Sequence, residues 1–189
     1  MNRTVSVRRQ RRALKRLDWI EAGQRLLISG GLHGVKLAAL TRELGVTSGS
    51  FYHHFTDFRE YMDALADYYG GENIDRIRDA LEQVPDPAER LRLMLSLREE
   101  WDIARLDAAM RVWASSDERA RNAVARLDDK LIELFREAFG ELGFSSTDAR
   151  VRALLAFAAG VGQPFLFGRP PSPEDAGAAL ELLMRPARP

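Results

Sequence analysis

The chain has 189 residues, of which 46% are hydrophobic and 30% are charged, and it contains no cysteine. This composition suits a globular protein with a sizeable core and excludes disulfides, thiolate metal sites and thiol nucleophiles. The formal net charge is zero, but residues 1–60 carry 11 Lys and Arg against 5 Asp and Glu, whereas the remainder carries 17 against 23. This asymmetry is typical of a polyanion-binding module joined to a second module, and a solvated basic tail explains it equally well.

The first 13 residues are rich in arginine and are predicted to form a flexible basic arm. They lack the apolar run of a signal peptide. No stretch of about 18 consecutive apolar residues occurs anywhere, so we expect no membrane span and a cytoplasmic protein.

Helical periodicity recurs along the chain and predicts three helices before residue 56. The first covers 14–29 and ends at the Gly30-Gly31 pair, with an apolar side made of Leu17, Ile20, Leu27 and Ile28. The second covers about 36–44 and ends at Gly45. The third covers about 48–55, with Phe51 and Phe55 facing inward because they are four residues apart.

The later segments also predict helices, so the fold class is all-α. Asp57 and Glu60 form a predicted capping box for a helix that runs to about residue 84, with a kink or break at Gly70-Gly71. Asp86 followed by Pro87 starts the next helix, and Asp117 caps a later long one. The predicted ranges after residue 86 are about 87–101, 103–114, 118–143, 147–161 and 173–185.

Residues 14–60 have the layout of a helix-turn-helix DNA-binding domain: an anchoring helix, a turn containing Gly45, and a short second helix offered outward. If the two phenylalanines hold the second helix to the domain, Tyr52, His53 and His54 face outward together with the hydroxyls before them. No acidic residue lies among them, and such donors suit phosphate oxygens and base edges. Gly49 allows the backbone to approach DNA closely.

The segment from Leu37 to Phe55, read with the capped helix after it, resembles the DNA-binding motif of the TetR (tetracycline-repressor) family. In that family an apolar helix precedes Gly-Val-Ser, Gly-x-aromatic-Tyr-x-His-Phe and a capped fourth helix. The detailed resemblance covers about residues 17–65, while residues 61–189 match a helical ligand-binding and dimerisation domain only in architecture.

The resemblance implies a homodimer that binds an inverted-repeat operator in double-stranded DNA, most simply as a repressor released by a small-molecule effector. The residues that it carries over as DNA contacts are Lys36, Thr47, Ser48, Gly49, Ser50, Tyr52, His53, His54 and Arg59. Two positions depart from the family pattern. Ser48 and Phe58 stand where relatives often carry a lysine, and Arg59 or the basic arm is expected to supply the missing phosphate contact.

An apolar, aromatic-rich set on two consecutive helices is the predicted effector site, although such residues also suit an ordinary core. Its members are Met94, Leu97, Trp101, Met110 and Trp113. A largely apolar ligand is therefore expected.

No catalytic, metal or cofactor site is expected. His53 and His54 are adjacent on a helix and point about 100° apart, which does not suit chelation of one ion. Ser50 does not lie in a Gly-x-Ser-x-Gly elbow. The alternative to a regulator is a helical interaction protein or enzyme that keeps a helix-turn-helix without binding DNA.

Overall fold

The computed structural model describes residues 13–100, 103–166 and 172–186. Most of the predicted basic arm, together with Trp101, lies outside the described residues. Within these ranges the secondary structure is helical, with no strand, which confirms the all-α prediction.

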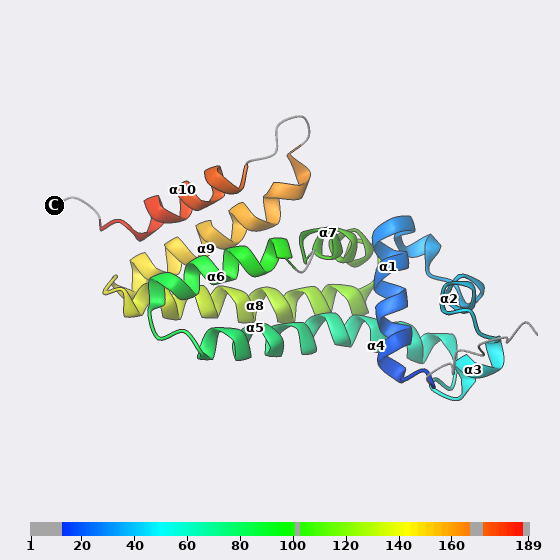
Figure 1. Ribbon diagram of the computed structural model, residues 1–189. Helices are drawn as coiled ribbons and strands as arrows, with labels where there is room; N and C mark the ends of the chain where they lie inside the picture. The colour runs from blue at the N-terminus through cyan, green and yellow to red at the C-terminus, as the bar shows by residue number, and fades with distance from the viewer. Residues whose placement is uncertain (1–12, 101–102, 167–171, 187–189) are drawn as a thin grey trace, which may run out of the picture.

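The helices follow one another with short connections (Figure 1). Their bounds are α1 Arg16–Gly34, α2 Leu37–Leu44, α3 Ser48–Tyr52, α4 Phe58–Gly70, α5 Glu72–Glu82, α6 Pro87–Glu100, α7 Ile103–Ala114, α8 Glu118–Glu141, α9 Ser146–Gly162, the 3-10 turn η1 Gln163–Phe165 and α10 Pro173–Met184. In Figure 1, α1 to α3 and the start of α4 form one end of the molecule, and α5, α6, α8, α9 and α10 form the other.

The predicted helix boundaries are confirmed in part. The first helix is interrupted at Gly31, as predicted, because this residue is non-helical (φ 61°), and a further helical stretch after the kink runs to Gly34. The third helix ends at Tyr52 instead of 55. Of the two predicted alternatives at Gly70-Gly71, the structure has the break, so α4 and α5 are separate elements. The predicted helix starts at Asp57, Pro87 and Asp117 are confirmed.

Two clusters of buried side chains fill the molecule. The first joins α1 to α4 with α7 and the N-terminal half of α8, and it contains Trp19, Phe51 and Trp113. The second joins α5, α6, α9 and α10 with the C-terminal half of α8. Because the first cluster includes residues on both sides of position 60, apolar packing runs across the predicted domain boundary.

The inner face of α1 differs from the prediction. Ile20 and Leu27 are buried as expected, but Leu17 is 40% exposed. The centre of the face is Trp19, which is fully buried.

A buried polar network lies where α4, α7 and α8 meet. The Tyr69 hydroxyl donates to Asp107 Oδ1 at 2.6 Å, and Arg111 Nε donates to Asp107 Oδ2 at 3.1 Å. The same guanidinium donates two hydrogen bonds to Asp128 on α8. The network therefore fixes the C-terminal end of α4 to the two helices behind it, and each buried polar group in it has a partner.

Candidate nucleic-acid interface

Two phenylalanines anchor the short helix α3 to the body of the domain. Phe51 is 0% exposed and Phe55 is 2% exposed, and their rings stack with centroids 5.1 Å apart. Phe51 also meets Trp19 of α1 edge to face at 5.4 Å. Tyr61 of α4 meets Phe55 edge to face at 5.0 Å and donates its buried hydroxyl to the Trp19 carbonyl oxygen at 3.0 Å. Burial raises the pKa of Tyr61 well above its usual value, so the hydroxyl remains a donor.

Gly45 makes the sharp turn between α2 and α3. Its φ of 64° and ψ of 38° are left-handed, a conformation that glycine adopts without the penalty of a side chain. The amide of Val46 then donates to the Thr41 carbonyl oxygen at 3.0 Å and closes the end of α2. This is the turn expected from the sequence, and it directs α3 away from α2.

The other side of α3 faces solvent. Tyr52 is 57% exposed, and Thr47, Ser48, Gly49 and His53 are also exposed. Ser50 and His54 are half-buried, and the His54 ring lies 6.3 Å from that of Trp19. His54 is therefore less available than predicted. The exposed groups form a surface of hydroxyls, an imidazole and a phenol on one short helix.

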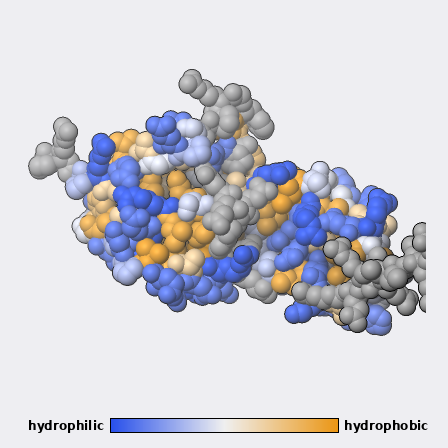
Figure 2. All heavy atoms as spheres, viewed as in Figure 1, coloured by the Kyte–Doolittle hydropathy of each residue, from blue (hydrophilic) through white to orange (hydrophobic). Residues whose placement is uncertain are grey.

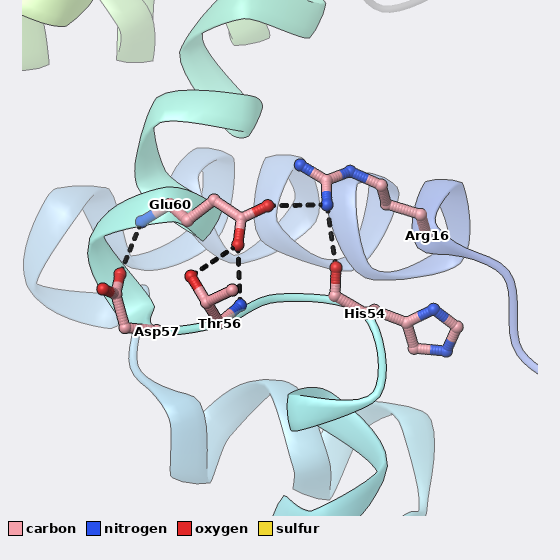
Figure 3. Close-up of polar contacts among 5 residues, drawn as sticks. All are labelled: Arg16, His54, Thr56, Asp57 and Glu60. Carbon is pink, nitrogen blue, oxygen red and sulfur yellow. Dashed lines mark hydrogen bonds and ion pairs between the residues drawn. The ribbon is translucent and has the colours of Figure 1, made fainter.

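A polar cluster holds the segment between α3 and α4 (Figure 3). Arg16 Nη1 donates to the His54 carbonyl oxygen at 2.8 Å and to Glu60 Oε1 at 2.9 Å, and its guanidinium lies 4.3 Å from the Phe55 ring centroid. In Figure 3 the His54 ring points away from these contacts. Arg16 thus fixes the backbone of the predicted DNA-contacting segment through the carbonyl group of His54. The His54 imidazole takes no part in this cluster.

The predicted capping box at α4 is only half correct. Asp57 Oδ1 accepts from the Glu60 amide at 2.8 Å as expected. Glu60 Oε2 does not return to Asp57 but accepts from the amide and hydroxyl of Thr56, at 2.6 and 2.8 Å. The hydrogen bond from the Thr56 amide, followed by that from Arg16, lowers the pKa of Glu60 from 4.5 to about 2.

Phe58, which departs from the family pattern, packs against other aromatic rings. It is half-buried, and its ring lies 5.6 Å from Tyr61 and 6.3 Å from Phe51. The position is thus used for aromatic packing. Arg59 beside it is exposed, as is Lys36, the residue preceding α2. These two cations flank the exposed side of α3 along the chain.

The predicted effector residues divide between the two buried clusters. Met94 and Leu97 line a cavity of about 70 Å³ together with Ile77, Phe135 and Phe157. Met110 and Trp113 lie in the other cluster, against α1 and α4. The structure therefore does not bring the predicted set together at one site. A second cavity of about 130 Å³ lies between α6, α9 and α10. Its lining residues come from distant parts of the chain and were not predicted from the sequence.

No described group of three or more His, Cys, Asp or Glu side chains is arranged to hold a metal ion. No described helix has the length and apolarity needed to cross a membrane.

Residues 20–60 match the family described as bacterial regulatory proteins, tetR family. This N-terminal segment is therefore similar to members of that family. The match spans α1 to the start of α4, which includes the turn at Gly45 and the whole of α3. No curated protein matches the sequence.

Solved structures share the fold over nearly the whole chain. A TetR-family transcriptional regulator from Rhodococcus sp. has a TM-score of 0.69 at 20% identity, covering 90% of this chain and 98% of its own. A transcriptional regulator from Saccharomonospora viridis in complex with choline has a TM-score of 0.68 at 20% identity, covering 89% and 92%. FadR from Bacillus subtilis in complex with stearoyl-CoA has a TM-score of 0.65 at 17% identity, covering 90% and 98%. This chain therefore has the fold of a TetR-family transcriptional regulator.

Proposed function

We propose that this protein is a homodimeric repressor that binds an inverted-repeat operator through α3 and leaves it when a largely apolar ligand enters the C-terminal helices. The main support for the proposal is that α3 has one buried side and one exposed side. Phe51 and Phe55 are buried while Tyr52 is 57% exposed, so the helix offers hydrogen-bonding groups to a duplex without losing its hold on the domain.

The proposed DNA contacts combine base and phosphate recognition. Tyr52 and His53 on the exposed side, with Thr47 and Ser48 before them, are placed to reach base edges or phosphate oxygens. Lys36 and Arg59 are the proposed phosphate contacts because both are exposed cations that lie close to α3 along the chain. The remaining members of the proposed surface, Ser50 and His54, are half-buried and contribute at its edge.

The dimer is proposed to form through α9 and α10. Large apolar side chains are exposed on these helices and on η1 and the residue after it: Val151, Leu154, Leu155, Phe165, Leu166 and Leu182. In the view of Figure 2, hydrophobic residues reach the surface of the C-terminal part in several places. An exposed apolar face of this kind is typical of a self-complementary interface in a two-fold dimer. Such a dimer sets the separation between its two recognition helices and so requires an inverted-repeat operator.

The effector site is proposed to include the cavity beside Met94 and Leu97. The similar regulators crystallised with choline and stearoyl-CoA are ligand-bound proteins of the same fold. The structures similar to this chain are regulators, which favours regulation over the enzyme alternative.

The decisive experiment is selection of bound duplexes from a random pool at near-physiological salt. We expect enrichment of an inverted repeat whose affinity falls steeply as ionic strength rises, because neutralised phosphates release counterions. Tyr52→Ala should weaken binding to the selected duplex about tenfold or more, within the range of one good base contact. The matched control is Val112→Ala, which truncates another exposed side chain (63% exposed) on α7. No enrichment, or equal effects of the two variants, would refute the assignment.

Gly49 gives a second test of the same surface. A Cβ added at Gly49 would meet only Thr47 Oγ1, at an ordinary 3.7 Å, so the folded chain does not require glycine there. Alanine is the better helix former by about 0.5–1 kcal/mol. Gly49→Ala should therefore leave the protein as stable or more stable while weakening operator binding, because the backbone can no longer approach the duplex closely. Unchanged operator affinity would place the duplex elsewhere on the surface.

A further inference from the structure

Two of the cavities in the C-terminal part adjoin one another. The cavity of about 130 Å³ lies between α6, α9 and α10, and that of about 70 Å³ lies among α5 to α9. Leu95, Ala156 and Gly160 line both. The two cavities therefore meet at a shared wall, which a rotamer change of the partly buried Leu95 side chain would open.

The larger cavity is lined mainly by apolar side chains. Small residues line it from α9 and α10, including Ala156, Ala159, Ala176 and Ala179, and Leu180 and Leu183 close it. The smaller cavity continues with Met94, Phe135 and other apolar side chains. Adjoining cavities with such apolar walls suit a hydrocarbon chain better than a polar molecule.

Two polar residues also line the larger cavity. Gln163 and Asp175 are the polar residues among the described lining residues of the larger cavity, and Asp175 is ionisable. Asp175 Oδ2 accepts from the Ser172 amide at 2.9 Å and from its hydroxyl at 2.8 Å. The hydrogen bond from the Ser172 amide lowers the pKa of Asp175, so the carboxylate is charged at neutral pH. Among the described residues, none donates a hydrogen bond to Oδ1.

We propose that the two cavities form one site for a cationic amphiphile, an alkylammonium whose chain occupies the apolar length and whose ammonium lies beside Asp175 and Gln163. The carboxylate attracts an ammonium and repels a carboxylate head of the same chain length. This inference rests on the proposed function, because it names the class of effector. It also places the effector beyond Met94 and Leu97, against α9 and α10.

Direct binding to the full-length protein without DNA tests the proposal. Isothermal titration calorimetry would compare decyltrimethylammonium, decanol and decanoate below their micellar concentrations. We expect the ammonium to bind at least tenfold more tightly than decanoate, with decanol between them. Asp175→Asn should lower the affinity for the ammonium about fivefold, the upper range for a solvent-accessible ion pair. Glu174→Gln is the matched control, because Glu174 is the neighbouring exposed acid and does not line the cavity.

Chain length gives a second measure that does not depend on the head group. Affinity should rise about fourfold per methylene until the cavity is filled and then level off. Ala176→Leu narrows the larger cavity and should move that plateau to shorter chains, while preserving the preference for the cationic head.

Three results would overturn the proposal: no binding by any of the three probes, decanoate binding as tightly as the ammonium, or equal effects of Asp175→Asn and Glu174→Gln. Operator binding is measured separately on the same preparations. If the amphiphile does not bind but operator binding is intact, only this class of effector is refuted. If no operator is selected, the proposed function itself is refuted.

Discussion

The two buried clusters are filled in different ways. Around α3 and α4, aromatic rings pack edge to face or stack at 5.0 to 5.6 Å, and Tyr61 adds a hydrogen bond across them. Around α9, the second cluster consists mainly of aliphatic and small side chains and contains the two adjoining cavities. Dense packing resists deformation, and unfilled apolar space can accept a ligand. The difference agrees with the proposal that α3 is a fixed recognition surface and that the C-terminal helices respond to a ligand.

Removing one ring from each cluster tests this difference most strongly. Phe51→Ala should lower the free energy of unfolding by about 4 kcal/mol, because the fully buried ring loses close contacts on all sides. Phe135→Ala should cost less, about 3 kcal/mol, because Phe135 already borders a cavity. Urea unfolding at one fixed protomer concentration measures both. Equal losses would show that the second cluster is packed as firmly as the first.

A glycine in α1 allows the aromatic cluster to close. A Cβ added at Gly23 would lie 1.9 Å from the Tyr61 hydroxyl oxygen. Gly23→Ala should therefore displace the hydroxyl from the Trp19 carbonyl oxygen and cost about 2–4 kcal/mol, from overpacking and a lost buried hydrogen bond. Gly30→Ala in the same helix is the control, since a Cβ there meets nothing within 4 Å. Thermal unfolding of the two variants should differ clearly, and similar values would contradict the close approach of α1 and α4.

The polar network between α4, α7 and α8 joins the two regions, and its removal should have an intermediate effect. Tyr69→Phe removes the hydroxyl that donates to the buried Asp107 and leaves a carboxylate oxygen without this donor. The expected loss is about 1–3 kcal/mol. Tyr52→Phe is the matched control, because it removes the same group from an exposed side chain. Chemical unfolding compares them, and a loss no larger than that of the control would show that the junction does not depend on this hydrogen bond.

Helix starts and turns could be predicted from the sequence because their causes are local. Asp57, Asp117 and Ser172 accept from amides two or three residues ahead, and Gly45 adopts the left-handed conformation that its turn requires. A cap or a turn involves only neighbours along the chain. The layout of the helix-turn-helix follows from these local signals together with the inward phenylalanines, and the family match over residues 20–60 agrees with it.

The partners of each helix face could not be predicted in the same way. Periodicity shows that Met94 and Trp113 face inward, but it does not show what they contact. The packing of α7 against α1 places Trp113 in the aromatic cluster, whereas Met94 on α6 borders a cavity. Trp19, Ala22, Gly23 and Leu27 have the spacing of a buried stripe, a signal that was available in α1 and that centres on Trp19 instead of Leu17. Residues from distant segments, such as Gln163 and Asp175, meet at a cavity only once the helices are packed.

The smallest expected effect concerns the pH dependence of the rigid region. Glu60 is a carboxylate whose pKa is lowered from 4.5 to about 2, chiefly by the hydrogen bond from the Thr56 amide and then by that from Arg16. Because the folded pKa lies below the usual one, the stabilisation is present above about pH 4.5 and is lost as the pH falls toward 2. Glu60→Gln should therefore reduce the slope of stability against pH in this window and leave the slope above pH 5 unchanged. Glu21→Gln, at an exposed glutamate of α1, is the control, and urea midpoints measured from about pH 2.5 to 6 provide the comparison. If both variants keep the wild-type slope, the Arg16, Thr56 and Glu60 cluster does not hold the segment after α3 in solution, and the rigidity of the recognition surface depends on the aromatic rings alone.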